Sequence, residues 1–390
     1  MRNRMIKAAA AVPSMKVADT AYNTEQIIQI IKDNSDCGLI VFPELCITGY
    51  TCGDLFSQET LLAGAEEGLL RIAEETRNIK GLTAVVGLPV RHRNTVYNCA
   101  AYVSEGEVKG LVPKINIPNY SEFYENRWFA SGRGVINEKV KIGGREIPFG
   151  CDLLFEDQTT GAVIGTDICE DLWVPDKPST HACLAGANII VNLSASDELI
   201  GKQDFRRMMT VQQSACCYCG YLYVSSGTDE SSTDLVFSGH TMIAENGRLM
   251  KDAIFTGRPS VQTAVLDLEK IMYNRQHMNT FRTEEGMYQF IPVSVRPLCD
   301  TIEITVDELL AALIKEDFAV ARNPFVPADD EERGRRCRKI LQIQANGLAT
   351  RVRATGLKNL VIGISGGLDS TLALLVYAEA RKIIPDIKII

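Results

Sequence analysis

Three positions place a carboxylate, an ammonium group and a thiol where apolar runs of the chain end. Glu44 closes a run that begins at residue 39, Lys114 one that begins at residue 111, and Cys169 one that begins at residue 162. Each run predicts a buried strand, and α/β proteins place reactive groups at the carboxyl ends of strands. A base, a cation for the oxyanion and a nucleophilic thiol are what attack on an amide carbonyl requires. The sequence therefore predicts amide chemistry at Cys169.

The sequence does not have the residue spacing that other common hydrolytic mechanisms require. The four histidines stand at positions 92, 181, 240 and 277, and no two are spaced as a metal-binding pair. We therefore expect neither a metal site nor a Ser-His-Asp triad. Cys216, Cys217 and Cys219 have no second ligand pair at zinc spacing. They are interpreted as small apolar residues in a helix packing seam.

A glycine-rich turn near residue 365 has the residue types that bind phosphate. It runs from Val361 to Ser370 as Val-Ile-Gly-Ile-Ser-Gly-Gly-Leu-Asp-Ser, between a predicted strand and a predicted helix. Glycines admit a phosphate close to the backbone, and a helix N-terminus favours its charge. The Gly-Lys-Ser/Thr of a Walker loop is absent. The turn also matches a G-x-S-x-G nucleophile elbow, which we set aside because no histidine follows His277.

The first three segments resemble the Glu-Lys-Cys triad of the nitrilase superfamily of carbon–nitrogen hydrolases. Phe42–Leu45, Pro113–Lys114 and Asp167–Glu170 carry the resemblance, and their order and spacing suit that superfamily. The resemblance implies an α/β fold, a four-layer αββα sandwich. It also implies that Glu44 is the general base, Lys114 the oxyanion and orientation partner, and Cys169 the nucleophile.

Residues 1–275 more narrowly resemble the glutaminase domains of glutamine-dependent NAD synthetases, through residues 42–50, 113–129 and 192–202. This resemblance implies L-glutamine as the substrate. The residues that match glutamine-binding positions are Tyr50, Tyr120, Phe123, Glu170, Ser196 and Lys202. Many relatives carry arginine at position 202, and lysine keeps the charge without the planar fork. Glu122 resembles the supporting second carboxylate and is grouped with this site.

The glycine turn resembles the pyrophosphate loop of N-type ATP pyrophosphatases. The implied ATP contacts are Gly363, Ser365, Gly366, Gly367, Asp369 and Ser370. Mg²⁺ is implied with ATP, deamido-NAD is implied as the second substrate, and no cofactor is implied for the glutaminase part. Ammonia from glutamine would amidate deamido-NAD, inside a homo-oligomer. We expect incomplete synthetase activity, because the doubly wound parallel sheet of such a domain needs further strands.

Hydrophobic periodicity predicts the elements that position these residues. Strands are expected at 6–12, 39–42, 84–90, 100–103, 162–167, 189–193, 222–225 and 261–266. Helices are expected at 61–77, at 205–217, and along a face marked by Val17, Ala21, Ile27, Ile28 and Ile31. The long loop 113–150 is interpreted as functional. Residues 276–330 are predicted to be a linker. Residues 331–390 are predicted to begin a second domain, with helices at 331–355 and 370–381 and strands at 359–364 and 387–390.

Composition narrows the possible partners. The 390 residues include 41 Lys and Arg against 49 Asp and Glu, a formal net charge of −8. No basic block is present, so we expect neither nucleic acid nor a membrane as a partner. Twelve cysteines in a chain of this length fit reduced thiols in the cytoplasm.

Two alternatives remain open at the sequence level. The first is a nitrilase-type amidase that acts on another small amide, which the appended phosphate loop disfavours. The second is an assembly or regulatory module whose triad is inherited but catalytically silent.

Overall fold

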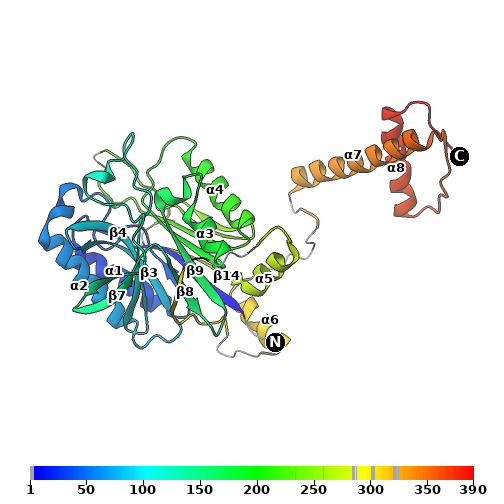
Figure 1. Cartoon of the computed structure of the whole chain (residues 1–390). Helices are drawn as coiled ribbons and strands as arrows, with labels where there is room; N and C mark the ends of the chain where they lie inside the picture. The colour runs from blue at the N-terminus through cyan, green and yellow to red at the C-terminus, as the bar shows by residue number, and fades with distance from the viewer. Residues whose placement is uncertain are drawn as a thin grey trace. The chain divides into compact units, whose positions relative to one another are not determined.

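The computed structural model describes residues 4–390, apart from residues 233, 258, 283–285, 287, 300–303, 319–322, 324 and 328. Its contacts divide the chain into two compact units, residues 1–318 and 319–390 (Figure 1).

The first unit contains two sheets, as far as the described residues extend. One has the order β14-β1-β2-β3-β4-β5-β7-β6, and the other β13-β12-β11-β10-β9-β8-β15. The strands of the first sheet are β14 (Ser260–Asp267), β1 (Met5–Val12), β2 (Leu39–Val41), β3 (Thr83–His92), β4 (Thr95–Ser104), β5 (Glu107–Pro113), β7 (Arg145–Phe149) and β6 (Glu138–Ile142). Those of the second are β13 (Arg248–Ala253), β12 (Thr241–Glu245), β11 (Gly220–Ser225), β10 (Ile189–Ser194), β9 (Ala162–Ile168), β8 (Leu153–Asp157) and β15 (Gln289–Pro292).

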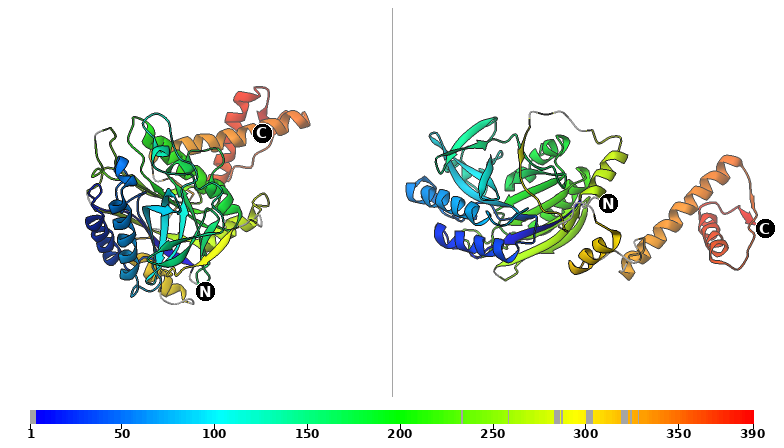
Figure 2. Two further views of the ribbon diagram at one scale, coloured as in Figure 1. Left: turned by 60° about the vertical axis from the view of Figure 1, so that its left-hand side comes forward. Right: turned by 90° about the horizontal axis from the view of Figure 1, so that it is seen from below.

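Helices cover the outer face of each sheet. Helices α1 (Thr20–Asp33) and α2 (Glu59–Glu75) pack on the first sheet, and α3 (Pro178–Leu184) and α4 (Lys202–Cys216) on the second. The left view of Figure 2 shows the strands between the blue helices and the green ones. The predicted four-layer αββα sandwich of the nitrilase superfamily is therefore confirmed.

Alternate side chains of β1 contribute to two different hydrophobic cores. Ala9 and Ala11 pack with residues of α1 and α2, whereas Ile6 and Ala8 belong to the core between the sheets. Alternate side chains of a strand point to opposite faces, so one short sequence serves both layers.

All eight predicted strands of the first unit are present, and seven of them agree within two residues at each end. The exception is β4, which begins at Thr95, five residues before the predicted start. The long loop predicted at 113–150 is shorter, because the hairpin β6–β7 occupies its last part. The predicted first helix begins only at Thr20, so Val17 precedes it, and Ala21 is exposed on it. The cysteine prediction is wrong for Cys216, which is exposed, while Cys217 and Cys219 are buried as expected.

The linker predicted at 276–330 is wrong for most of its length. Strand β15 extends the second sheet, and the Val295 N–H donates to Asp157 Oδ2 at 2.6 Å. Val295 is buried in the core between the sheets. Helices α5 (Leu268–His277) and α6 (Val306–Lys315) complete the unit, which extends to residue 318. Within the rest of the predicted linker, residues 319–322, 324 and 328 lie outside the described residues. The prediction failed because β15 is only four residues long and shows no extended apolar run.

The second unit consists of α7 (Asp330–Thr355), β16 (Asn359–Leu360), α8 (Leu368–Ile383) and β17 (Lys388–Ile389). β16 and β17 pair in parallel, and α8 connects them. The predicted order of helix, strand, helix and strand is confirmed, although both strands are shorter than predicted. Asp329 caps α7, because its side chain accepts the N–H of Glu332 at 2.7 Å.

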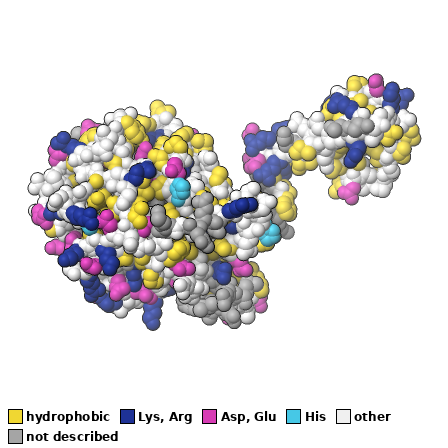
Figure 3. Space-filling model, viewed as in Figure 1, with side chains coloured by type: hydrophobic (Ala, Val, Ile, Leu, Met, Phe, Trp, Pro, Cys, Tyr) yellow, Lys and Arg dark blue, Asp and Glu magenta, His cyan; other side chains and the backbone are white. Residues whose placement is uncertain are grey.

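The molecular surface is mixed in charge. On the face of the first unit seen in Figure 3, basic and acidic side chains are interspersed. None of the described helices is long and apolar enough to cross a membrane.

Candidate active site

Glu44 lies in a loop directly after β2 and is fully buried. Its Oε1 accepts two hydrogen bonds, from Lys114 Nζ at 2.7 Å and from Asn98 Nδ2 at 2.6 Å. Its Oε2 is buried and has no hydrogen-bond partner in the described part of the chain. A buried acceptor without a partner is costly, which is typical of an atom reserved for a ligand or a proton.

Lys114 follows the last residue of β5 and holds its ammonium group between two carboxylates. Nζ lies 2.7 Å from Glu44 Oε1 and 2.8 Å from each oxygen of Glu125. Burial works against the charged form, but the charges of Glu125 and Glu44 outweigh it and raise the pKa of Lys114 well above its ordinary value. Lys114 is therefore a fixed cation.

Cys169 begins a short 3₁₀ turn (Cys169–Leu172) directly after β9. Its φ is +45°, a strained conformation for a residue with a side chain. The turn is held by Asp171, whose Oδ2 accepts the N–H of Ile168 at 3.0 Å, and the N–H of Cys169 donates to Asn192 Oδ1 at 3.2 Å. These contacts fix a sharp strand-to-helix turn that presents the thiol.

The thiol of Cys169 is influenced by both partners predicted from the sequence. Burial and then the charge of Glu44 raise its pKa, Lys114 lowers it, and Glu125 raises it further. The net result is a pKa well above the ordinary value, so the thiol is protonated at neutral pH and needs a base. The structure thus brings the predicted base and cation into contact and places the thiol within reach of their charges.

The raised pKa of Cys169 makes its alkylation by iodoacetamide dependent on high pH. The thiolate is the reacting species, so the rate at Cys169 should still be rising at pH values where the rate of a free cysteine peptide is constant. Mass spectrometry of the peptide that contains Cys169 would measure it, with a free cysteine peptide, which levels off above its pKa of about 8.5, as the control. A plateau below pH 8 would show that Cys169 is a stabilised thiolate.

Five of the seven predicted glutamine-binding residues form one set of linked contacts. Tyr120 donates to Glu170 Oε2 at 2.8 Å, and its ring lies 6.0 Å from that of Phe123. Lys202 pairs with Asp197, lies 3.8 Å from Glu122 Oε1, and stands 5.1 Å above the Phe123 ring.

Tyr50 and Ser196 are held against the buried groups of this site. The hydroxyl of Tyr50 donates to Glu125 Oε1 at 2.9 Å. Ser196 is buried, and its Oγ accepts from Arg206 Nη1 at 3.3 Å. A cavity of about 260 Å³ is lined by both Tyr50 and Glu122.

The assignment of the second carboxylate to Glu122 is wrong. Glu125, three residues later, holds Lys114, whereas Glu122 is half-buried near Lys202. The left-handed backbone at Ser121 and the 3₁₀ turn Glu125–Arg127 turn Glu125 inward. Burial raises the pKa of Glu125, Lys114 opposes this effect, and Glu44 adds to it. The burial of Glu125 could have been expected from the aromatic residues that precede and follow it within a few positions.

Sequence reasoning also missed the residues that support the site from behind. Asn98 contacts Glu44. Asp171 accepts a hydrogen bond from Asn116 Nδ2 at 2.8 Å, which joins the turn after β9 to the loop after β5. Glu230 is buried and accepts the N–H groups of Tyr50 and Thr51 at 2.7 and 3.0 Å. All three are ordinary polar residues without a motif.

Gly87 in β3 lies directly behind the loop that carries Glu44. A Cβ at this position would stand 2.7 Å from Pro43 O and 2.8 Å from the carbonyl carbon of Glu44, both of them backbone atoms. We expect Gly87→Ala to lower the free energy of unfolding by about 1–3 kcal/mol. Displacement of the base should also lower the rate of any reaction at Cys169 about 100-fold. Gly257→Ala, whose Cβ would meet no atom within 4 Å, is the matched control. A Gly87→Ala variant with normal melting and activity would contradict the expectation.

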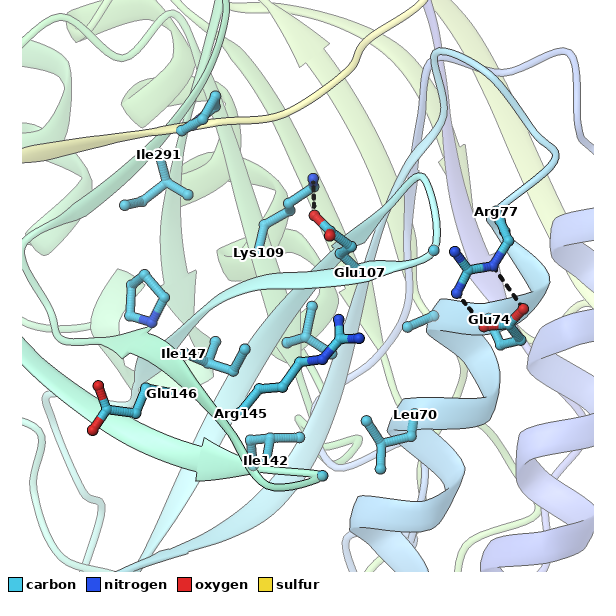
Figure 4. A pocket seen from close by; sticks show the side chains of 16 residues that line it. Leu70, Glu74, Arg77, Glu107, Lys109, Ile142, Arg145, Glu146, Ile147 and Ile291 are labelled. Atoms are coloured by element: carbon cyan, nitrogen blue, oxygen red, sulfur yellow. Dashed lines mark hydrogen bonds and ion pairs between the residues drawn. The ribbon is translucent and has the colours of Figure 1, made fainter.

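A second cavity, of about 550 Å³, lies elsewhere on the first unit (Figure 4). Its charged groups include two close pairs, Lys109 with Glu107 at 2.7 Å and Arg77 with Glu74 at 2.5 Å. None of its lining residues belongs to the predicted site. Among the described residues no group of three or more His, Cys, Asp or Glu is arranged to hold a metal ion.

The predicted phosphate loop lies in the second unit, between β16 and α8. Gly367 caps α8, and Gly366 has a φ of +79°. The hydroxyl of Ser370 donates to Gly367 O at 3.1 Å and lies 3.4 Å from Ser365 Oγ. Gly363 and Gly366 have open space where a Cβ would stand. Together with Asp369 in the first turn of α8, these residues form an exposed turn at a helix N-terminus.

Comparison with known proteins defines the class to which this fold and site belong. A family model described as carbon-nitrogen hydrolase matches residues 7–275. The chain belongs to the carbon-nitrogen hydrolase family.

Two of the similar curated proteins have the same name. The chain is 38% identical over 379 residues to the glutamine-dependent NAD(+) synthetase of Mycobacterium tuberculosis, covering 96% of this chain and 55% of that protein. It is 29% identical to the enzyme of the same name from Aquifex aeolicus, covering 96% and 59%. The chain thus spans about half the length of the curated relatives it matches.

Solved structures agree on the fold. A glutamine-dependent NAD(+) synthetase from Cytophaga hutchinsonii matches with a TM-score of 0.60 at 23% identity, over 98% of this chain and 53% of that one. A carbon-nitrogen hydrolase from Helicobacter pylori matches with a TM-score of 0.55 at 17% identity, over 70% and 93%.

Proposed function

We propose that the first unit hydrolyses L-glutamine and supplies ammonia to a glutamine-dependent NAD synthetase. The observation that carries the proposal is the fully buried Lys114, which is held between Glu44 and Glu125 and whose charge acts on the thiol of Cys169, a residue with a strained backbone. A buried ion cluster with an unpaired oxygen is costly to the fold, and such groups are typical of reaction sites. The names of the relatives, which include glutamine, support the choice of substrate.

The proposed reaction has two halves, in which a thioester on Cys169 is formed and then hydrolysed. Cys169 Sγ bonds to the side-chain carbonyl carbon of glutamine while Glu44 takes the thiol proton. Lys114 stabilises the negative charge that develops on the carbonyl oxygen. The carbon–nitrogen bond then breaks, and Glu44 returns the proton to the leaving ammonia. Water, deprotonated by Glu44, attacks the thioester and releases glutamate and the thiol.

We propose that Glu170, Tyr120, Phe123, Ser196 and Lys202 contact the bound glutamine. The contacts that link Tyr120 with Glu170 and Lys202 with the Phe123 ring support this assignment. An amidase of the same fold from Nesterenkonia, 16% identical over 70% of this chain, is recorded with a covalent acetamide adduct on its active-site cysteine. That adduct supports Cys169 as the nucleophile by analogy of fold.

We further propose that the turn from Gly363 to Ser370 binds ATP with Mg²⁺. The open space at Gly366 and the N-terminus of α8 fit a phosphate group. ATP would activate deamido-NAD as an adenylate for amidation by the ammonia, in a homo-oligomer. In this chain, Ser365 and Ser370 would hold phosphate oxygens.

The test is glutamate release from L-glutamine by the purified chain, beside a Cys169→Ala variant. We expect release by the wild type, loss in the variant, and at least tenfold lower kcat/KM for asparagine and short ω-amides. Equal release by both proteins would refute a role for Cys169. Preference for another amide would establish an amidase of different specificity. No release, combined with no adduct on Cys169 from a glutamine-like chloroketone, would establish a silent module.

A further inference from the structure

The two oxygens of Glu44 have different environments. Oε1 accepts from both Asn98 Nδ2 and Lys114 Nζ, at 2.6 and 2.7 Å. Oε2 is buried and accepts no hydrogen bond from the described residues. A carboxylate whose one oxygen is held by two donors from different strands cannot rotate freely, so the free oxygen has a fixed direction.

Asn98 also holds the backbone of the second charged group. Its main-chain carbonyl accepts the N–H of Lys114 at 2.8 Å, next to the pair of Cys99 and Pro113 in the β4–β5 ladder. Asn98 itself lies opposite Pro89 in the β3–β4 ladder and is 1% exposed. One residue on a central strand therefore contacts the predicted base through its side chain and the predicted cation through its backbone.

We propose that Asn98 is a positioning residue that reserves Glu44 Oε2 as the atom that takes the thiol proton. The inference rests on the proposed glutaminase function. Lys114 has several N–H donors and can pair with both oxygens of a carboxylate, as it does with Glu125. Without the amide of Asn98, Glu44 would be free to turn and give both oxygens to Lys114. Its free oxygen would then be withdrawn from Cys169.

The test compares Asn98→Leu with the wild type in glutamate release. Leucine keeps the approximate size and removes the donor. We expect kcat to fall about 10- to 100-fold, because a displaced base costs rate, while KM changes less than threefold. The rate at which a glutamine-like chloroketone alkylates Cys169 should fall by a similar factor, because that reaction also requires the thiol proton to pass to Glu44.

Asn188→Leu is the matched control. Asn188 is also buried, but its side chain bonds to the backbone of Gly161 and Val163, outside the predicted site. We expect this variant to be less stable and to keep the wild-type rate of alkylation at Cys169. Asn98→Asp, which is isosteric and replaces the donor with an acceptor, serves if Asn98→Leu fails to fold. The kcat of Asn98→Asp should fall at least as far as the decrease expected for Asn98→Leu.

The outcomes separate this inference from the proposed function. An Asn98 variant with wild-type kcat and alkylation rate overturns the positioning role. A lower kcat with an unchanged alkylation rate, as in the Asn188 control, shows a purely structural residue and also overturns it. If the wild type releases no glutamate, the proposed function fails and the inference fails with it.

Discussion

Replacing Glu44 with glutamine is expected to lower kcat for glutamate release about 10³-fold. Glutamine has the same shape, but it cannot take the thiol proton, and general-base catalysis contributes about 10²–10⁴ in rate. The measurement is single-turnover and steady-state glutamate release at pH 7.5. KM should change little, because the proposed role of Glu44 is in proton transfer and not in holding glutamine.

Glu146→Gln is the control for this substitution. Its side chain is 62% exposed and lies 3.6 Å from Lys139 on the surface. It should match the wild type in rate. A Glu44→Gln variant that keeps more than a tenth of the wild-type kcat would show that another group takes the proton.

Replacing Lys114 with methionine is expected to lower the free energy of unfolding by about 3–5 kcal/mol. The substitution leaves Glu44 and Glu125 buried near each other without their shared cation. The chain has two tryptophans, Trp128 and Trp173, and both lie in the first unit. Urea unfolding followed by tryptophan fluorescence therefore reports on this unit alone.

A double variant and a change of pH test whether the loss of stability comes from the two unpaired carboxylates. Adding Glu125→Gln removes one of the two unpaired charges and should recover at least half of the loss. Because burial already raises the pKa of Glu125, its proton returns as the pH falls, so the loss should be smaller at pH 5 than at pH 8. Lys139→Met, on an exposed side chain, should change stability by less than about 0.5 kcal/mol. A loss for Lys114→Met no larger than that of this control would contradict the buried cluster.

The sequence was informative where one local pattern determines the structure. Strands such as β1 and β10 contain short apolar runs, and Glu44, Lys114 and Cys169 lie within three residues of strand ends. Their meeting at one edge of the fold follows from the topology of the superfamily, which the resemblance implied. The periodicity alone did not indicate it.

The predictions failed where the structure depends on the path of the backbone and on contacts between residues far apart in sequence. The choice between Glu122 and Glu125 is decided by the left-handed residue Ser121 and by the buried hydroxyl of Tyr50, 75 residues away from Glu125. No hydrophobic period passes through that loop. Strand β15 was missed because its four residues alternate between half-buried and exposed, and only its pairing with β8 makes them a strand.

The segment between residues 289 and 318 decides where a separately produced first unit can end. The carbon-nitrogen hydrolase match stops at residue 275, yet β15 covers the edge of β8, and Lys7 pairs with Glu316 at 2.7 Å. A gene fragment cut at the end of the match would expose a bare sheet edge, which promotes aggregation. An expression plasmid for the isolated domain should therefore encode the chain as far as residue 318.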